Sequence, residues 1–159
     1  MDVAVLLFEG FDELDAVAPY EVFQTAAEMG ADLDVSTRTL VPDEGVTAGH
    51  GLTVEPDDVL FGTPDLVVVP GGGWNERESP GVWTEFEDGT LPERLGTLHE
   101  AGATIASVCT GAMLSRRPAS WTAGRRPPTS PRKTTSGSTT WTSATSASST
   151  TARFSPRVA

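Results

Sequence analysis

The charges along this chain divide it into two parts that cannot share one hydrophobic core. Of its 159 residues, the first 114 hold all 22 acidic residues and only three basic ones, Arg38, Arg77 and Arg94, a formal charge of −19. Residues 115–159 hold eight basic residues and no acidic one, and 20 of these 45 positions are Ser or Thr. This second part contains no Leu or Ile and lacks helix or strand periodicity. We therefore expect the folded domain in residues 1–114 and a disordered or non-native tail in residues 115–159.

Composition and charge exclude several classes of function. A single Cys leaves no intrachain disulfide and no CxxC zinc or redox motif. The chain does not start with the pattern of a secretory signal, and no apolar run approaches the roughly 18 residues that span a bilayer. The acidic first part repels phosphate backbones and anionic lipids. We expect a cytoplasmic protein with no nucleic-acid or membrane partner. The sequence has no phosphate loop, metal cluster or nucleotide fingerprint, so we also expect no cofactor or metal. The acid-rich, Lys-free first part also predicts a halophilic source.

Apolar runs and glycines predict alternating strands and helices in residues 1–114. Strands are expected at residues 3–8, 32–40, 65–70 and 104–108, helices at 12–29 and 91–101, and a hairpin at 46–54 with its tip at Gly49-His50-Gly51. The first helix would tolerate Pro19 only near its start and would bury Leu14, Val17, Val22, Phe23 and Ala26. This order predicts a flavodoxin-like, doubly wound, mostly parallel sheet, whose ligands bind beyond the carboxyl ends of the strands.

Two of these strand ends carry groups suited to catalysis. Strand 65–70 runs into Gly71-Gly72-Gly73, whose backbone N–H groups can bind an oxyanion. Strand 104–108 meets Cys109, followed by small residues that start a helix, which is the pattern of a nucleophile elbow. The helix N-terminus favours the thiolate, and amides of Thr110 and of the glycine turn could hold the charge that forms when it adds to a polarised carbon. On spacing alone, a lone Cys is more often a buried apolar residue.

The residues that carry these features resemble the ThiJ/PfpI superfamily of the class I glutamine amidotransferase-like fold. Three segments carry the resemblance: LDAVAPYEVF at residues 14–23, VPGGG at 69–73 and ASVCTGA at 106–112. The first segment and the Cys-Thr-Gly of the third are most similar to the isonitrile hydratase-like branch. The resemblance implies that Cys109 is the nucleophile, that Asp15 is the acid whose carboxyl hydrogen-bonds its sulfur, and that Thr110 and Gly72 supply the oxyanion hole. It also implies a homodimer where the full-length fold is intact.

Other candidate residues have alternative interpretations. Two negative charges in one dry site repel each other, so we expect a thiolate to raise the pKa of Asp15 and to make it a proton donor. Without the family, Asp15 is a solvated carboxylate at a helix entrance. His50 and His99 are expected to be surface or packing residues, and Trp74 either walls a substrate pocket or packs. Protease-like members carry a His directly after the Cys, where this chain has Thr110, which argues against proteolysis.

By resemblance, the leading hypothesis is a cysteine-dependent hydratase or hydrolase that acts on a small molecule such as an isonitrile. One alternative is a non-catalytic ligand-sensing domain of a transcriptional regulator, although no helix-turn-helix is visible. A second is a cysteine redox sensor or deglycase-like stress protein in which Cys109 is oxidised. A third is that this chain is inactive whatever its relatives do.

The superfamily normally continues after the elbow with a Gly-Leu-Leu-Asp-Gly segment and a Thr-Thr-His motif, neither of which follows Cys109 here. Both can be encoded one reading frame away from residues 119–129. Residues 119–124 written GCC TCC TGG ACG GCC GGC, for example, give Leu-Leu-Asp-Gly-Arg from the third base. We hypothesise a frameshift between about Leu114 and Pro118, real or introduced in sequencing. The alternative is a genuine basic, Ser/Thr-rich disordered tail that binds an acidic partner. As written, the chain lacks the C-terminal part of the fold, and we expect Val68, Ile105 and Val108 to be partly uncovered.

Overall fold

The computed structural model describes residues 1–116. The predictions made for the tail and for the frameshift fall almost entirely on residues 117–159, which lie outside the described residues. None of the helices in the described part has the length and hydropathy of a membrane span. The same residues contain no group of three or more His, Cys, Asp or Glu side chains placed to hold a metal ion.

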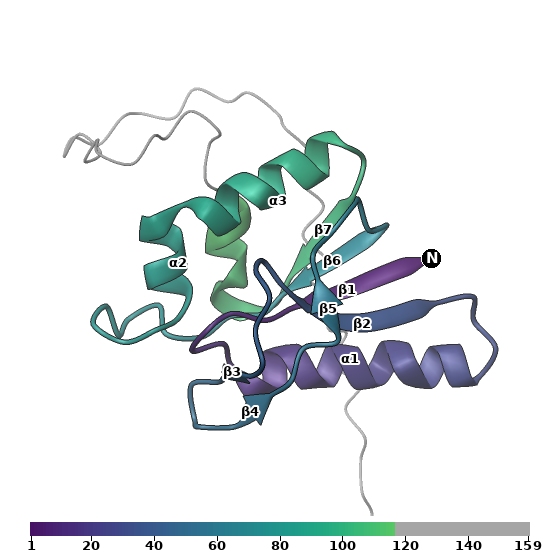
Figure 1. The fold of residues 1–159 in the computed structure, drawn as a ribbon, viewed down its shortest axis with the longest axis horizontal. Helices are drawn as coiled ribbons and strands as arrows, with labels where there is room; N and C mark the ends of the chain where they lie inside the picture. The colour runs from purple at the N-terminus through teal and green to yellow at the C-terminus, as the bar shows by residue number, and fades with distance from the viewer. Residues whose placement is uncertain (117–159) are drawn as a thin grey trace, which may run out of the picture. The chain divides into compact units, whose positions relative to one another are not determined.

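A five-stranded parallel sheet organises the described residues (Figure 1). Its strand order is β5-β2-β1-β6-β7, and each neighbouring pair is parallel. The strands are β1 (Asp2–Leu6), β2 (Asp34–Thr39), β5 (Asp58–Val59), β6 (Leu66–Val69) and β7 (Thr104–Ser107). Helix α1 (Glu13–Glu28) lies on one face of the sheet, and α2 (Val82–Asp88) and α3 (Thr90–Glu100) lie on the other. The structure confirms the predicted doubly wound, flavodoxin-like α/β fold.

The predicted hairpin is also present, outside the main sheet. Strands β3 (Val46–Thr47) and β4 (Thr53–Val54) pair antiparallel, with His50 in the turn between them. The hairpin is anchored to the loop before α1, because the Gly10 N–H donates to the Thr47 carbonyl at 2.8 Å and the Gly49 N–H donates to the Phe11 carbonyl at 2.8 Å. Two elements, α2 and β5, were not predicted. At seven and two residues they are too short to show a clear hydrophobic period.

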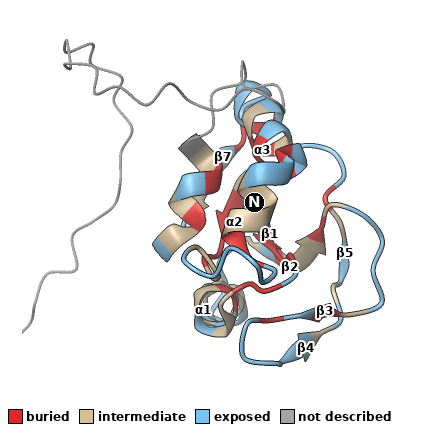
Figure 2. Cartoon of the chain, turned by 90° about the vertical axis from the view of Figure 1, so that its left-hand side faces the viewer, coloured by how far each residue is buried: buried red, intermediate tan, exposed pale blue. Residues whose placement is uncertain are grey.

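The core lies along β1 and β6, as Figure 2 shows. All six residues from Val3 to Phe8 are buried, and four of them have no exposed surface at all. Val67, Val68 and Val69 on the neighbouring strand are equally enclosed. The continuous apolar runs therefore correspond to strands covered on both faces, as the sequence predicted.

Helix α1 buries a different face from the predicted one. Leu14 is 72% exposed and Val22 is 66% exposed, and Val17 is also exposed, so the prediction was wrong for these three residues. The face toward the sheet instead starts at the buried Ala16 and continues four and seven positions later with Tyr20 and Phe23, which pack against the core. The helix carries apolar residues on more than one face, which made its orientation ambiguous in the sequence.

Pro19 lies further into α1 than its chemistry suggested. It is the seventh residue of the helix, not one of its first turn, which corrects the expectation from the sequence. Because proline has no N–H, the carbonyl of Asp15 receives no helical hydrogen bond from residue 19. The helix nevertheless continues to Glu28, since its later residues pack against the sheet through Phe23.

Strand β7 forms one edge of the sheet within the described residues. Ile105 and Val108 are half-buried there, as expected for a chain without the later part of the fold. The same expectation is wrong for Val68, which is only 3% exposed. Val68 lies on β6, and β6 has a partner strand on each side.

Candidate active site

Cys109 stands at a strained turn directly after β7. It is the first residue of η1 (Cys109–Arg116), a 3₁₀ helix, and the one non-glycine residue of the described part with positive φ, at 51°. A left-handed backbone costs an ordinary residue about 1–2 kcal/mol, so the surrounding hydrogen bonds must hold it. On one side of it, the Val108 N–H donates to the Val69 carbonyl at 2.9 Å; on the other, the Gly111 N–H donates to the Val108 carbonyl at 2.9 Å.

The Cys109 side chain is exposed. This exposure does not fit the alternative of a buried apolar Cys. The turn also requires Gly111, because a Cβ at that position would lie 2.4 Å from the Val69 carbonyl oxygen and 2.5 Å from that of Pro70. Strand, exposed Cys and close-packed glycine together have the geometry predicted for a nucleophile elbow.

The structure brings all four predicted site residues together where α1 begins and β6 and β7 end (Figure 1). The Asp15 carboxyl lies close enough to the Cys109 side chain for the thiol to influence its pKa. The same carboxyl accepts the Gly71 N–H at 3.1 Å through Oδ2. The Gly72 N–H donates to the Thr110 hydroxyl at 3.1 Å, so this amide is engaged by a side chain of the site itself.

Gly72 is held in place by the loop that leads into α1. Its φ of 121° is a conformation that residues with a side chain rarely adopt, and a Cβ there would lie 2.5 Å from the Gly10 carbonyl oxygen and 2.6 Å from the Asp12 nitrogen. The Asp12 N–H donates to the Gly71 carbonyl at 2.8 Å. Gly72 therefore lies between this loop on one side and Thr110 on the other.

Asp15 owes its position to the cap of α1. The Asp12 side chain accepts the N–H groups of Leu14 at 3.1 Å and Asp15 at 3.4 Å, which fixes the first turn of the helix. Burial raises the pKa of the Asp15 carboxyl above its ordinary value, and the negative charge of Asp12 adds to this rise. The hydrogen bond from Gly71 and the nearby Cys109 thiol act in the opposite direction without reversing it. The direction is the predicted one, but its main cause is burial rather than repulsion by the sulfur.

Sequence reasoning missed a second contact at this helix start, between His50 and Glu13. The His50 ring Nδ1 lies 2.7 Å from Glu13 Oε2, and its backbone N–H donates to Glu13 Oε1 at 2.8 Å. The contact raises the pKa of His50 and lowers the pKa of Glu13 to about 2. His50 is exposed, as expected of a surface residue. A His at a hairpin tip gives no sequence signal for a partner 37 residues away.

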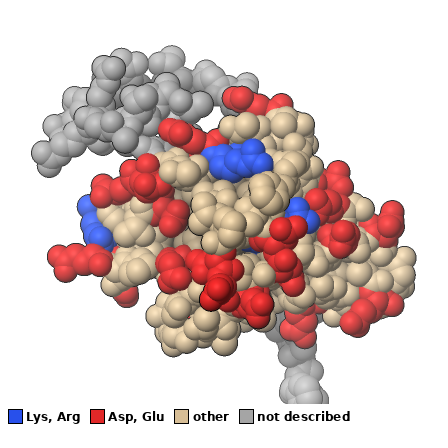
Figure 3. All heavy atoms as spheres, in the orientation of Figure 1, with Lys and Arg blue, Asp and Glu red and all other residues tan. Residues whose placement is uncertain are grey.

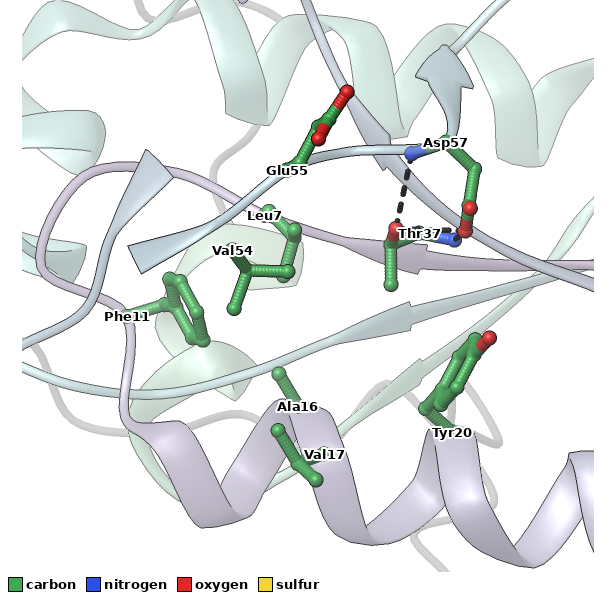
Figure 4. Close-up of a pocket in the computed structure, with 9 residues that line it drawn as sticks. All are labelled: Leu7, Phe11, Ala16, Val17, Tyr20, Thr37, Val54, Glu55 and Asp57. Atoms are coloured by element: carbon green, nitrogen blue, oxygen red, sulfur yellow. Dashed lines mark hydrogen bonds between the residues drawn. The ribbon is translucent and has the colours of Figure 1, made fainter. Parts of the chain in front are cut away.

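Two hollows flank α1, and they differ in chemistry. One, of about 250 Å³, lies between α1 and β2 and is mainly apolar, lined by Phe11, Ala16, Val17 and Tyr20 among others (Figure 4). Its polar edge is the pair of Thr37 and Asp57, which hydrogen-bond each other. None of the four predicted site residues lines it. This hollow is therefore separate from the candidate site.

The second hollow, a cleft of about 380 Å³, adjoins the glycine turn. Gly72 and Gly73 form part of its wall, together with the hairpin turn around His50 and the carboxylate residues Glu9, Asp12 and Glu76. Trp74, which follows the turn, packs edge-on against Trp83 and Phe86 with ring centroids 5.1 and 5.6 Å away. Of the two interpretations of Trp74, the structure favours packing.

The family model of DJ-1/PfpI matches residues 1–131. The chain belongs to the DJ-1/PfpI family. No curated protein sequence matches this DJ-1/PfpI member.

Solved structures of other proteins share the fold. A cysteine-to-alanine mutant of a DJ-1 superfamily protein from Salmonella typhimurium is 22% identical over 70% of this chain and 56% of that chain, with a TM-score of 0.53. Toxoplasma gondii DJ-1 in an oxidized form is 22% identical over 69% and 56%, with a TM-score of 0.55. An AraC family transcriptional regulator from Pseudomonas putida is 21% identical over 72% and 58%, with a TM-score of 0.54. This chain therefore spans less than two thirds of each of these structures.

Proposed function

We propose that this DJ-1/PfpI protein is a cysteine-dependent hydratase or hydrolase that acts on a small electrophile such as an isonitrile, with Cys109 as its nucleophile. One observation carries the proposal. Cys109 is exposed, held in a left-handed conformation at a strand end, and close to the Asp15 carboxyl, whose pKa is raised by burial. Strain and a perturbed carboxyl beside a nucleophile are features that gather at catalytic sites.

The proposed reaction uses the protonated form of Asp15, which the raised pKa of this carboxyl favours. The Cys109 thiolate forms a bond to the carbon of an isonitrile, and the Asp15 carboxyl gives its proton to that carbon, which leaves a thioimidate and an Asp15 carboxylate. The carboxylate then takes a proton from water as the hydroxide adds to the same carbon. The carbon–sulfur bond breaks, the new hydroxyl proton moves to nitrogen, and an N-substituted formamide leaves. Thiolate and protonated Asp15 are regenerated.

Thr110 and Gly72 supply the hydrogen bonds that the intermediate needs. The Thr110 hydroxyl accepts the Gly72 N–H, so its own hydrogen is left to donate to a substrate. Rotation of the Thr110 side chain would instead release the Gly72 amide for the same purpose. One donor of this kind is typically worth about 3 kcal/mol of the reaction barrier.

The test is hydration of a small isonitrile to its formamide, followed by mass spectrometry, with the native chain, Cys109→Ala and Cys109→Ser. We expect turnover by the native chain and none by either variant. Formamide production by Cys109→Ala at the native rate would remove Cys109 as the nucleophile. No turnover by the native chain, with Cys109 still reactive toward thiol reagents, would favour the two alternatives below.

The first alternative is a ligand-sensing domain, and the shared fold of the Pseudomonas putida AraC family regulator favours it. Such a domain would bind an electrophile or its adduct at Cys109 without releasing product. A stable mass increase on Cys109 that survives dilution would distinguish this function from turnover.

The second alternative is a redox sensor or a deglycase-like stress protein. The exposed Cys109 beside Asp15 supports it, since exposure is the first requirement for oxidation to a sulfinate. A sulfinate at Cys109 after mild peroxide treatment, without activity on isonitriles or aldehydes, would support the sensor. Removal of an aldehyde adduct from a peptide would support the deglycase.

We also propose that a frameshift between about Leu114 and Pro118 separates the incomplete domain of residues 1–114 from a non-native segment at 115–159. The half-buried edge strand β7 supports the proposal, because Ile105 and Val108 are available to a further element. Resequencing of codons 110–125 and the intact mass of the native protein test it. An extra or missing base would point to a longer, cytoplasmic, dimeric enzyme from a halophile. An unchanged frame and mass would point to an inactive relative.

A further inference from the structure

We infer that the Cys109 site selects its substrate by charge: it favours electrophiles that carry an amine or another cationic group and disfavours carboxylates and phosphates. The inference rests on the proposed function, in which Cys109 is the nucleophile. It adds the chemical class of the substrate to that function.

Carboxylates lie close to the glycine turn. Asp12 caps α1, and its negative charge raises the pKa of the nearby Asp15 carboxyl. Glu9 and Glu76 line the cleft beside Gly72 together with Asp12. A substrate that approaches the sulfur along the turn therefore passes several acidic groups.

The cations of the folded part are engaged elsewhere. Arg38 pairs with Asp2, Arg77 lies over the Trp83 ring with its Cζ 3.9 Å from the ring centroid, and Arg94 donates to the carbonyls of Leu60 and Gly62. Residues 1–114 contain no Lys. Within Met1–Ser115, His50 contacts Glu13 and so engages one carboxylate at the start of α1. Figure 3 shows the same imbalance, with acidic side chains spread over the face in view and few basic ones.

Two of the backbone N–H groups that could attract an anion are also engaged. Glycine turns and helix N-termini commonly bind oxyanions through free N–H groups. Here the Gly71 N–H is bonded to Asp15 and the Gly72 N–H to the Thr110 hydroxyl. An approaching carboxylate or phosphate thus meets negative charge that these two amides do not offset. A cationic group experiences the opposite field and is concentrated at the cleft.

The test measures how fast Cys109 reacts with three methanethiosulfonate reagents: the cationic trimethylammonioethyl, the neutral methyl and the anionic sulfonatoethyl compound. In each, the thiolate attacks the reagent sulfur, a disulfide forms and methanesulfinate leaves, so the chemistry is the same. Cys109 is the only Cys of the full chain, which makes every adduct a report on this site. Each rate is divided by the rate of the neutral model thiol N-acetylcysteinamide. We expect the corrected cation-to-anion ratio to be about 10 or more in 0.1 M salt and to fall toward 1 in 1 M salt.

Charge-removing variants locate the effect. Asp12→Asn keeps an acceptor for the helix cap, and Glu76→Gln lies in an exposed loop, so both should fold. Each should lower the cation-to-anion ratio about two- to threefold. The matched control is Glu28→Gln, which removes the same charge from the far end of α1 and should leave the ratio unchanged. A native ratio near 1 at low salt, or site variants that behave like Glu28→Gln, would overturn the inference. Failure of Cys109 to react with any reagent would overturn the proposed nucleophile, and the charge selectivity with it.

Discussion

The centre of the sheet and its β7 edge differ in burial, in strand pairing and in backbone conformation. In the centre, residues Val3 to Phe8 are buried, and Val3 to Val5 pair with a strand on each side. At the edge, Ile105 and Val108 are half-buried, and Cys109 is exposed with a left-handed backbone. The comparison indicates that the fold is stabilised in one place and that its chemistry, as proposed, lies in another. Substitutions in the two regions should therefore have separable effects on stability and on activity.

The strongest test of this separation is Cys109→Ala. We expect turnover to fall by at least about 10⁴-fold, because the thiolate forms the covalent bond in the proposed reaction. Since the side chain is exposed, the free energy of unfolding should change by less than about 0.5 kcal/mol. Formamide production and urea unfolding of the same preparations measure the two quantities. A large decrease in the free energy of unfolding, together with the loss of turnover, would show that Cys109 is part of the stabilising core.

The reverse test is Leu6→Ala. Leu6 has no exposed surface, so its truncation should lower the free energy of unfolding by about 2–5 kcal/mol through lost burial and a residual cavity. The control, Ile105→Ala, removes a half-buried side chain of the edge strand and should cost only about 1 kcal/mol. The urea concentration at the midpoint of unfolding measures both changes, provided that the free energy of unfolding depends on urea with the same slope in each variant. Equal costs would mean that a further element covers β7 in solution.

The same difference explains what the sequence could predict. The central strands are continuous runs of Val, Leu and Phe, and burial on both faces is the physical reason for such runs. Because neighbouring parallel strands end at the same edge of a sheet, the sequence also predicted that Cys109 and the glycine turn lie close together. The orientation of α1 could not be predicted, because Leu14 and Val22 are as apolar as the residues that pack. The contact of His50 with Glu13 and the bond from Gly72 to Thr110 depend on tertiary approach, which leaves no periodic signal.

A smaller effect on activity is expected from Thr110→Val, which has the same shape but no hydroxyl. The variant cannot accept the Gly72 N–H or donate to a substrate, so turnover should fall roughly 10²-fold with little change in stability. Thr110→Ser keeps the hydroxyl and should retain most of the activity. Steady-state formamide production by the three proteins measures the difference. Native turnover by Thr110→Val would mean that the Gly72 amide alone stabilises the intermediate.

The smallest expected effect, and the one that joins the two regions, is the pH dependence of Asp15. Its pKa in the folded protein is raised from 3.8, so below pH 3.8 the carboxyl is neutral in both states and its contribution to stability is fully present. As pH rises through the folded pKa, the protein must ionise a partly buried carboxyl, and that contribution is lost. Asp15→Asn should therefore be slightly more stable than the native chain at pH 7, with the difference vanishing below about pH 4.

Activity should decrease with rising pH over the same range as this contribution to stability. The proposed reaction uses the protonated form of Asp15, so native turnover should decrease as pH rises through its pKa, and Asp15→Asn should be inactive throughout. Asp12→Asn, which removes a charge that raises this pKa, should shift the decrease to lower pH. Turnover and urea unfolding from pH 4 to pH 8 measure these shifts. If Asp15→Asn were less stable than the native chain at pH 7, the Asp15 carboxylate would stabilise the fold. The site would then not hold this carboxyl at a cost in stability, as the proposed function expects.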